Sequence, residues 1–236
     1  MSALGTVLVL DAAPPPQPKM AASATASTLA FELSDGGQRL VVNCGGPGPL
    51  PTDLPDELVQ GLRTTAAHST LVLSDTNSTN ILADGSLGKG VEDVAIERSE
   101  DNDASRLEAS HDGYVRAFGM LHKRSLMLGN DGKELRGADQ LIPKGRKKIR
   151  DASPYSVRFH LAPGVEATTT ADGMGAILRS KGAPPWNFRC RGGNLAIEES
   201  LWIDGRGEPQ RTSQLVIVGE VSALGGEIGW TFRRAS

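Results

Sequence analysis

The clearest signal of the fold class is the stretch SLMLGNDGKELRG at residues 125–137. Two short apolar runs flank Asp131-Gly132, and an Asp-Gly pair supplies the positive φ angles that a tight hairpin turn requires. The same kind of turn sequence stands at residues 34–37 (Ser-Asp-Gly-Gly) and 170–173 (Thr-Ala-Asp-Gly). These three stretches predict antiparallel hairpins.

Short runs of apolar and β-branched residues, bounded by Gly, Pro, Asp or Ser, predict further strands at residues 29–33, 39–43, 69–73, 214–221 and 228–232. No βαβ crossover pattern is visible, which argues against parallel pairing. The best helical pattern is short, at residues 53–62, where Asp53 can cap the helix and Pro55 suits its first turn. The sequence therefore predicts an all-β fold: a large, multi-stranded antiparallel β-sandwich with at most one short helix.

The length of 236 residues fits one large β domain, and we expect residues 1–236 to form it. Within it, residues 1–18 are expected to be an edge strand followed by a Pro-rich connector. A Pro/Gly loop at residues 45–51 leaves open a separate packing of the first strands. A short basic run, from Lys144 to Arg150, follows Pro143.

Charge and composition exclude several classes of function. The chain has 25 Lys and Arg against 28 Asp and Glu, so the basic excess typical of a nucleic-acid-binding protein is missing. No apolar run reaches the roughly 18 residues of a membrane span, so no membrane insertion is expected. Residues 1–11 lack the basic start of a signal peptide, and we interpret them as a strand. Cys44 and Cys190 are too few for a disulfide framework; two buried thiols are favoured over one bridge.

Common catalytic and phosphate-binding motifs are missing, and four histidines remain: His68, His111, His122 and His160. A lone histidine in a strand is more often structural than catalytic. His111 begins the bend His-Asp-Gly-Tyr at residues 111–114. Strand alternation places Arg158 and His160 on one face of their strand. Such a face beside that bend suits an anion or a sugar, but an ordinary solvated face fits equally well.

The order and spacing of these motifs resemble the C-terminal β domain of the heparinase II/III family of polysaccharide lyases, over residues 19–236. None of the motifs is specific alone. The stretches that carry the resemblance are residues 28–33 (TLAFEL), 40–45 (LVVNCG), 67–73 (AHSTLVL), 109–114 (ASHDGY), 122–126 (HKRSL) and 158–161 (RFHL).

The resemblance implies an N-terminal (α/α) toroid beside the β-sandwich, with an acidic polysaccharide as substrate in the cleft between them. Family members cleave uronic-acid polysaccharides by β-elimination, in which a base removes the proton next to the carboxylate and an acid protonates the leaving oxygen. Within this chain His111 and Tyr114, from the 111–114 bend, are the candidate catalytic residues. The candidate substrate-binding residues are Arg158, His160, His122 and Arg124. The family also implies the cell envelope or the periplasm, although the chain shows no signal peptide.

The sequence departs from the family pattern where the family places its β-domain catalytic histidine and its structural zinc. Residues 23–27 hold no His and no Asp, and Asn43 stands where Asp is frequent. Of the expected zinc ligands only His68 remains, and since zinc needs about four ligands, no metal or other cofactor is expected. We therefore expect the chain to be inactive without a toroid. The alternative is a non-catalytic carbohydrate-binding or interaction module, in which the basic run at residues 144–150 meets acidic sugars or is simply a solvated loop.

Overall fold

Two antiparallel sheets make up the computed structural model, which describes residues 1–16, 24–46, 53–145 and 152–235. The strands of the first sheet follow in the order β1 (Ser2–Ala3), β2 (Thr6–Leu10), β3 (Phe31–Asp35), β4 (Gln38–Val42), β10 (Ser153–Leu161), β15 (Pro209–Val221) and β14 (Asn194–Ile203), and β5 (Leu71–Leu73) also pairs with β10.

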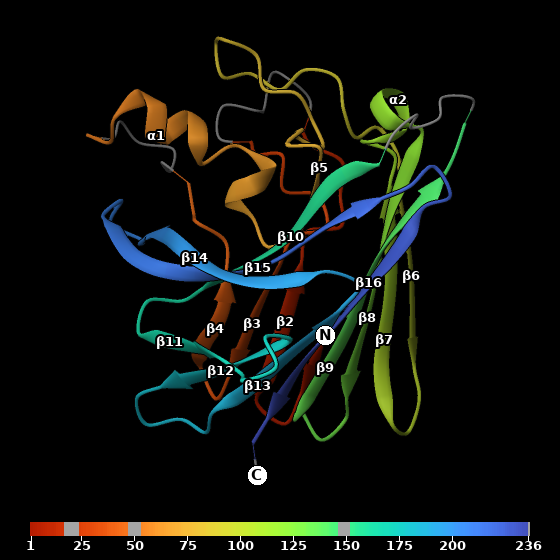
Figure 1. Ribbon diagram of the computed structural model, residues 1–236. Coiled ribbons are helices and arrows are strands. Elements are labelled where there is room, and N and C mark those ends of the chain that lie inside the picture. Colours follow the sequence, from red (N-terminus) through yellow and green to blue (C-terminus); the bar gives the residue numbers. More distant parts are fainter. Residues whose placement is uncertain (17–23, 47–52, 146–151, 236) are drawn as a thin grey trace.

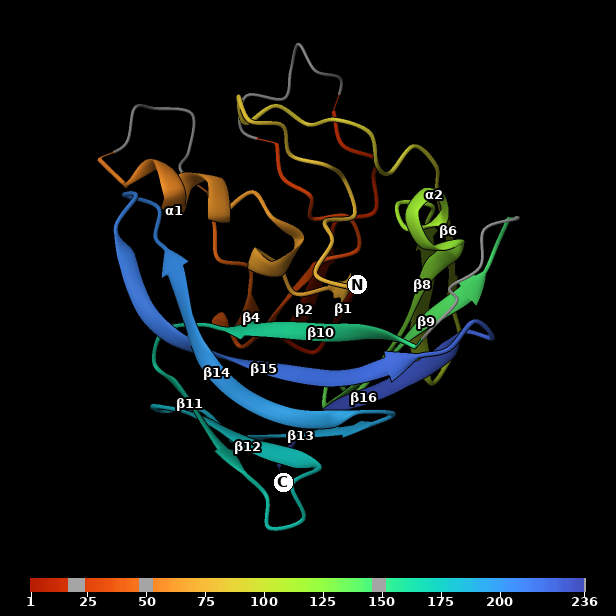
Figure 2. The ribbon, with the colours of Figure 1, turned by 45° about the horizontal axis from the view of Figure 1, so that its top comes forward.

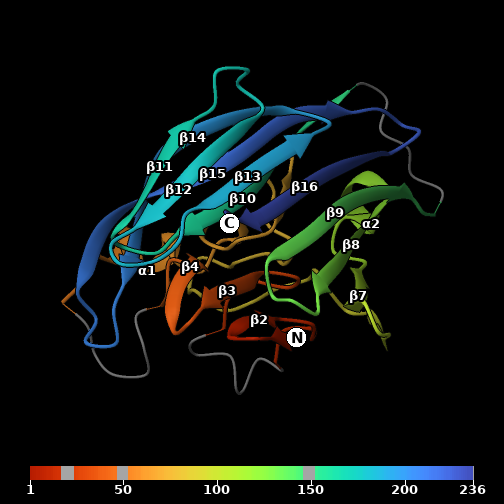
Figure 3. The ribbon, with the colours of Figure 1, turned by 90° about the horizontal axis from the view of Figure 1, so that it is seen from below.

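The second sheet has the order β11 (Val165–Thr169), β12 (Gly175–Ser180), β13 (Trp186–Arg191), β16 (Gly226–Arg234), β9 (Glu134–Pro143), β8 (Met120–Gly129), β7 (Ala104–His111) and β6 (Val94–Glu100). Figure 2 shows β10, β15 and β14 as one curved layer over β16 and β13. From below, the last strand β16 lies between β9 and β13 (Figure 3). The predicted antiparallel β-sandwich is confirmed.

The predicted hairpins form around their glycines. The 125–137 stretch joins β8 to β9, with Gly132 at a φ of +65°. Residues 34–37 join β3 to β4, and residues 170–173 lie between β11 and β12. A side chain at position 132 would also meet the carbonyl oxygen of Ala3 at 2.3 Å. Glycine is therefore required there both by the positive φ and by the close approach of Ala3.

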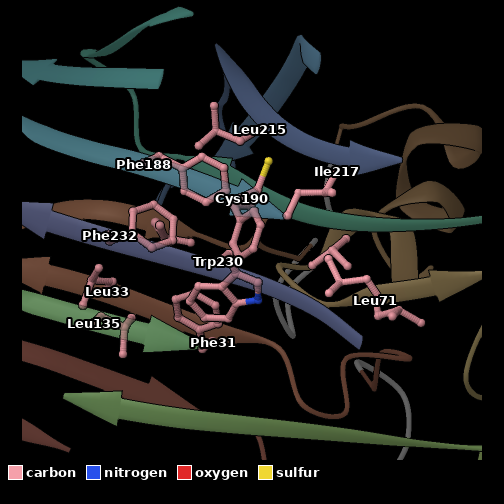
Figure 4. Close-up of a cluster of buried hydrophobic side chains, with 14 of the residues drawn as sticks. Phe31, Leu33, Leu71, Leu135, Phe188, Cys190, Leu215, Ile217, Trp230 and Phe232 are labelled. Atoms are coloured by element: carbon pink, nitrogen blue, oxygen red, sulfur yellow. The ribbon is translucent and has the colours of Figure 1, made fainter. Parts of the chain in front are cut away.

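The core lies between the sheets, and strands such as β8 and β13 contribute alternate residues to it. Phe31, Phe159, Phe188, Trp230 and Phe232 form its aromatic centre, with Phe31 and Trp230 stacked at a centroid separation of 5.4 Å. Figure 4 shows Phe31, Trp230 and Phe232 packed against one another. Cys190 is buried in the same cluster, Cys44 is buried elsewhere, and both are free, which confirms two buried thiols rather than a bridge.

Among the described residues, helix is limited to three short pieces: α1 (Asp56–Gly61), the 3₁₀ turn η2 (Thr65–Ala67) and α2 (Val115–Phe118). The prediction that Asp53 caps α1 is wrong, because Pro55 is the N-cap and no side chain bonds the first amides. The prediction of at most one short helix is exceeded by α2. This helix is a single turn that ends at Gly119, which has a left-handed backbone conformation. No described helix is long and apolar enough to cross a membrane.

The two α-helices and the long connections between β4 and β6 gather at one end of the sandwich, which we call the loop end (Figure 1). Some predicted strands are shorter because side chains occupy their backbone groups. At Ser69 the amide N–H donates to Asn43 Oδ1 and the carbonyl accepts from Arg124, so the strand begins only at Leu71. Leu29, with a φ of +66°, lies in a turn before β3.

Candidate functional site

A polar network of His111, His122, Arg124, Asp139 and Trp230 is enclosed in the otherwise apolar interior of the second sheet near the loop end. His111 faces His122 across β7 and β8, and Arg124 faces Asp139 across β8 and β9. Along β8, buried and partly exposed residues alternate strictly, and both His122 and Arg124 fall on the buried side. The first four members have at most 1% of their surface exposed.

The hydrogen bonds of this network fix the proton positions on both histidines. Gly113 N–H donates to His111 Nδ1 at 3.1 Å, so the neutral ring carries its proton on Nε2. That proton is donated to His122 Nδ1 at 3.0 Å, and His122 Nε2–H then donates to Asp139 Oδ1 at 2.7 Å. The result is one directed chain from the 111–114 bend to a buried carboxylate.

Arg124 connects this chain to the loop end. Its Nε and Nη2 donate to the two oxygens of Asp139 at 2.8 and 3.0 Å, and Trp230 Nε1–H donates to Oδ2 at 2.9 Å. Its Nη1 donates to the carbonyls of Leu29 at 2.7 Å and Ser69 at 2.8 Å. One guanidinium therefore holds two loop-end segments against the sheet.

The electrostatics of the network favour neutral histidines beside a charged carboxylate. Although burial opposes it, the Arg124 charge and the His122 bond keep the pKa of Asp139 below its usual range. Burial lowers the pKa of His122. Burial also lowers the pKa of His111, and the neighbouring His122 and Arg124 lower it further because they disfavour another positive charge. The arrangement is that of a structural ion pair with its hydrogen bonds satisfied.

Tyr114, the other candidate catalytic residue, is fully buried at the start of α2. Its hydroxyl donates to the carbonyl of Leu71 at 2.9 Å, and burial raises the pKa of the phenol. Neither Tyr114 nor His111 presents an acid or a base at the surface of the described part of the chain. Their catalytic role remains a prediction, and their geometry is that of core residues.

Arg158 and His160 do share one face of β10, as the alternation predicts, while Val157, Phe159 and Leu161 point into the core. His160 is not solvated: 2% of its surface is exposed, its Nε2–H donates to the Ala66 carbonyl at 3.0 Å, and its Nδ1 accepts from Ser200 Oγ at 2.7 Å. Burial lowers the pKa of His160 to about 3. Arg158, whose side chain is 22% exposed, pairs with Glu198 at 3.2 Å.

Four of the predicted site residues are therefore in one place, and two are in another. His111, Tyr114, His122 and Arg124 lie inside the second sheet's end of the sandwich, whereas Arg158 and His160 lie on the outer face of the first sheet. Sequence reasoning missed Asp139 and Trp230. A signal for Asp139 was present, because the register of the predicted 125–137 hairpin, continued two pairs beyond Leu126–Gly137, sets Asp139 opposite Arg124.

The residues in the zinc-ligand positions of the family do not fit the metal. Asn43 Oδ1 accepts from the Ser69 amide, and His68 Nδ1–H donates to the Thr64 carbonyl at 2.8 Å. Ala26, in the stretch without His or Asp, brings no donor side chain; its carbonyl instead accepts from the Thr65 hydroxyl at 2.9 Å. Within the described ranges no three or more His, Cys, Asp and Glu residues are grouped for a metal. That the chain binds no zinc remains a prediction.

An open groove of about 830 Å³ lies at the loop end, between residues 76–92 and α2. We call it the loop-end groove. Lys89 and Arg116 are exposed along it, and Asn77 and Asn80 add amide groups. Of its two carboxylates, that of Asp112 accepts the backbone N–H groups of residues 92 and 93. Glu92 is the second carboxylate. The groove therefore holds two cations and two carboxylates together with the amide groups of Asn77 and Asn80.

The 111–114 bend shapes this groove from below. Gly113 lines the groove, and a side chain there would meet the Ser78 carbonyl at 2.4 Å. Its amide is the donor to His111, so the buried network and the groove share this residue. Lys144 lies beside α2, its N–H donating to the Gly119 carbonyl at 2.7 Å. The rest of the basic run, residues 146–150, lies outside the described residues.

Comparison with known proteins agrees with the architecture. A curated relative, the FtsZ-localized protein C of Caulobacter vibrioides, is 29% identical over 250 residues, covering 97% of this chain and 40% of its own length. Among solved structures, the heparan sulfate lyase HepC of Pedobacter heparinus superposes with a TM-score of 0.75 at 15% identity, and a heparinase III does so with 0.76 at 13%. At such identities the likeness concerns the fold.

The chain spans about a third of these solved lyases, covering 33% and 32% of their lengths and being covered itself to 97% and 98%. The family model described as "Heparinase II/III-like, C-terminal" matches residues 1–231 and so includes the first strands before residue 19. The chain therefore belongs to the heparinase II/III-like C-terminal domain family.

Proposed function

We propose that this chain is the β-sandwich part of a polysaccharide lyase of the heparinase II/III type, and that it binds an acidic polysaccharide along the loop-end groove. The observation that carries the proposal is the groove itself. Its volume of about 830 Å³ falls in the range of ligand sites, and it combines Lys89 and Arg116 for acid groups with Asn77 and Asn80 for hydroxyls.

The position of the groove supports this role. Residues 24–27, within the stretch matched to the family's β-domain catalytic histidine, are tied to the same end by the bonds of Ala26 to Arg63 and Thr65. A helical toroid placed against this end would enclose the groove from the other side.

The chain by itself is proposed to lack lyase activity. All four histidines are 5% exposed or less, and each is engaged in a hydrogen bond with a protein group. Their lowered pKa values describe neutral, desolvated rings. General acid and base groups must reach the substrate, so in this proposal the toroid supplies them.

Binding is tested with Lys89→Ala and Arg116→Ala on immobilised heparin and alginate, measured as the salt concentration that elutes the protein. Each variant is expected to elute at lower salt, because each removes one cation from the groove. Lys133→Ala is the matched control, since Lys133 is also exposed but lies in the β8–β9 turn. Equal effects of all three substitutions would refute a site at the groove.

Activity is tested by following the ultraviolet absorbance of the unsaturated product with heparin, heparan sulfate and alginate. We expect none from the chain alone and turnover from a protein that joins it to a toroid. Turnover by the chain alone that disappears in His111→Gln, with the fold retained, would contradict the proposed division of labour.

A second candidate function is a non-catalytic interaction module. The specific observation in its favour is the relative named FtsZ-localized protein C, which matches 97% of the chain at 29% identity. The chain would then keep the fold and use it for localisation. A cell fractionation discriminates the two, since a lyase of this family is proposed to work in the cell envelope or the periplasm.

A further inference from the structure

A second hollow, of about 620 Å³, lies away from the loop end, and we call it the Trp202 pocket. Its walls come from β4, β14 and the turn between β10 and β11, elements on the left of Figure 1, whereas α2 is at the upper right. The residues that line it are Gly37, Gln38, Arg39, Ala162, Pro163, Gly164, Val165, Ser180, Lys181, Trp202 and Gln210.

Arg39 and Trp202 form the centre of this pocket. The Arg39 guanidinium carbon lies 5.4 Å from the centroid of the indole ring, a cation–π distance. Trp202 itself packs its apolar side against the core, so the ring is a fixed support. Arg39 is exposed and makes no ion pair among the described residues, which leaves its fork of N–H donors available to a ligand.

The charge of the pocket is uniformly positive. Lys181 is also exposed, and no Asp or Glu is among the described residues that line the hollow. The nearest carboxylate bonded to a lining residue is Asp204, 3.4 Å from the Gln210 amide. Asp204 is occupied by the backbone amides of Arg206 and Glu208 in its own turn. In contrast, each of Arg98, Arg136 and Arg191 has a carboxylate partner.

The opposite wall of the pocket is held in place by hydrogen bonds. Thr212 Oγ1–H donates to the Leu161 carbonyl at 2.8 Å, and the Ala162 amide donates to the Leu40 carbonyl at 3.1 Å. The turn then closes with the Val165 amide on the Ala162 carbonyl at 3.0 Å and with Gly164 at a φ of +84°. A site with fixed walls loses little ordering entropy when a ligand binds.

We propose that the Trp202 pocket is a second binding site, for a carboxylated or sulfated sugar residue. Arg39, braced on the indole, receives the carboxylate or sulfate through paired N–H donors. Lys181 adds a second charge, Gln38 and Gln210 receive hydroxyls, and the exposed part of the Trp202 ring contacts the sugar ring. The choice of an acidic sugar as the ligand rests on the proposed function. That the ligand is an anion with a face that can contact an aromatic ring rests only on Arg39, Lys181 and Trp202 of the pocket.

The experiment uses the intrinsic fluorescence of the chain. Of its three tryptophans, Trp186 and Trp230 are buried with 3% and 2% exposed, so a change on adding ligand reports Trp202. Heparin and polygalacturonate tetrasaccharides are the probes, a cellotetraose of equal length is the neutral control, and sulfate alone is the ion control. We expect a saturable change with the acidic tetrasaccharides and none with the other two.

The variants locate the site. Arg39→Gln is expected to weaken binding about tenfold, the loss for one charge-assisted pair. Arg179→Gln, an exposed arginine of β12 outside the pocket, is expected to change it less than about twofold. Trp202→Phe is expected to abolish the fluorescence response. Equal losses in Arg39→Gln and Arg179→Gln, or a response that persists in Trp202→Phe, would overturn the assignment, as would an equal response to sulfate alone.

Failure here is distinguishable from failure of the proposed function. Retention on heparin that depends on Lys89 and Arg116, with no response at Trp202, removes only the second site. A response that depends on Arg39, with retention independent of Lys89 and Arg116, removes only the groove. Thermal unfolding of Arg39→Gln checks that the variant is folded, and no stability loss is expected because Arg39 is exposed.

Discussion

Arg124 and Asp139 form a two-pronged ion pair whose side chains are both completely buried, with Nε to Oδ1 at 2.8 Å and Nη2 to Oδ2 at 3.0 Å. The pair joins the strands β8 and β9, and Arg124 extends it to the carbonyls of Leu29 and Ser69. It therefore connects the interior of the second sheet to segments at the loop end, where the candidate groove also lies.

Removing the carboxylate leaves a buried charge without compensation. We expect Asp139→Ala to lower the free energy of unfolding by about 3–5 kcal/mol, because the Arg124 charge then has no partner in the interior. Glu134→Ala is the matched control: Glu134 pairs with Arg136, whose side chain is 58% exposed, and its loss should cost less than about 1 kcal/mol. Urea unfolding measures both, and equal losses would contradict the importance of the buried pair.

The stability of the chain should depend on pH near neutrality. Burial lowers the pKa values of His68, His111, His122 and His160, the last to about 3, so the unfolded chain binds more protons than the folded one below the ordinary histidine pKa of about 6.5. The free energy of unfolding therefore falls as pH drops from about 6.5, by up to about 1.4 kcal/mol per pH unit for each histidine.

Asp139 affects the free energy of unfolding at lower pH than the histidines do. Its pKa is held down in the fold, so its contribution to stability is lost only below the ordinary Asp pKa of about 3.9. Urea unfolding between pH 7.5 and 4.5 tests the histidine effect. His160→Gln should reduce the slope of the free energy of unfolding against pH by the contribution of one histidine proton. A free energy that stays constant over this range would show that the rings are not held neutral.

Tyr114 is expected to contribute to stability and not to binding. Tyr114→Phe removes the hydrogen bond to the Leu71 carbonyl and should lower the free energy of unfolding by about 1 kcal/mol. Retention on heparin should be unchanged, since Tyr114 is 0% exposed. Arg116→Ala should show the reverse pattern. Lyase activity lost in Tyr114→Phe beyond its effect on folding would establish the catalytic role that the sequence suggests.

Two strand glycines should differ in how much stability a methyl group costs. A Cβ at Gly137 would lie 2.2 Å from Cζ2 of Trp230, a buried ring that cannot move aside, so Gly137→Ala should lower the midpoint of thermal unfolding and cost about 3 kcal/mol. At Gly229 the nearest atom is Nε of Arg191, whose side chain is 75% exposed. Gly229→Ala should change stability by less than about 1 kcal/mol, and a loss as large as that of Gly137→Ala would refute the distinction.

Much of the fold was readable from local chemistry. The Asp-Gly turns at 131–132 and 172–173 determined two hairpins, and alternation in residues 157–161 correctly placed Arg158 and His160 on one face of their strand. The cap of α1 was not readable, since Asp53 satisfies the sequence pattern but Pro55 occupies the cap position. The one-turn helix α2 was missed because a single turn leaves no periodicity to detect.

The candidate site was readable only in part. His111, His122 and Arg124 were named from the sequence, but as surface groups, because alternation separates two faces without saying which face of a polar strand is covered. Trp230, which bonds Asp139, is 91 residues further along the chain and enters only through the pairing of β16 with β9.

The sequence by itself determined the antiparallel sheets, their turns and the alternation along each strand, since these depend on neighbours only a few residues apart. The tertiary structure decided that His111, His122, Arg124 and Asp139 form a buried network, and that Arg39 meets Trp202 in an exposed pocket. Burial and charge pairing depend on which distant strands lie together, and it is burial that makes one arginine a structural ion pair and leaves another free to bind a ligand.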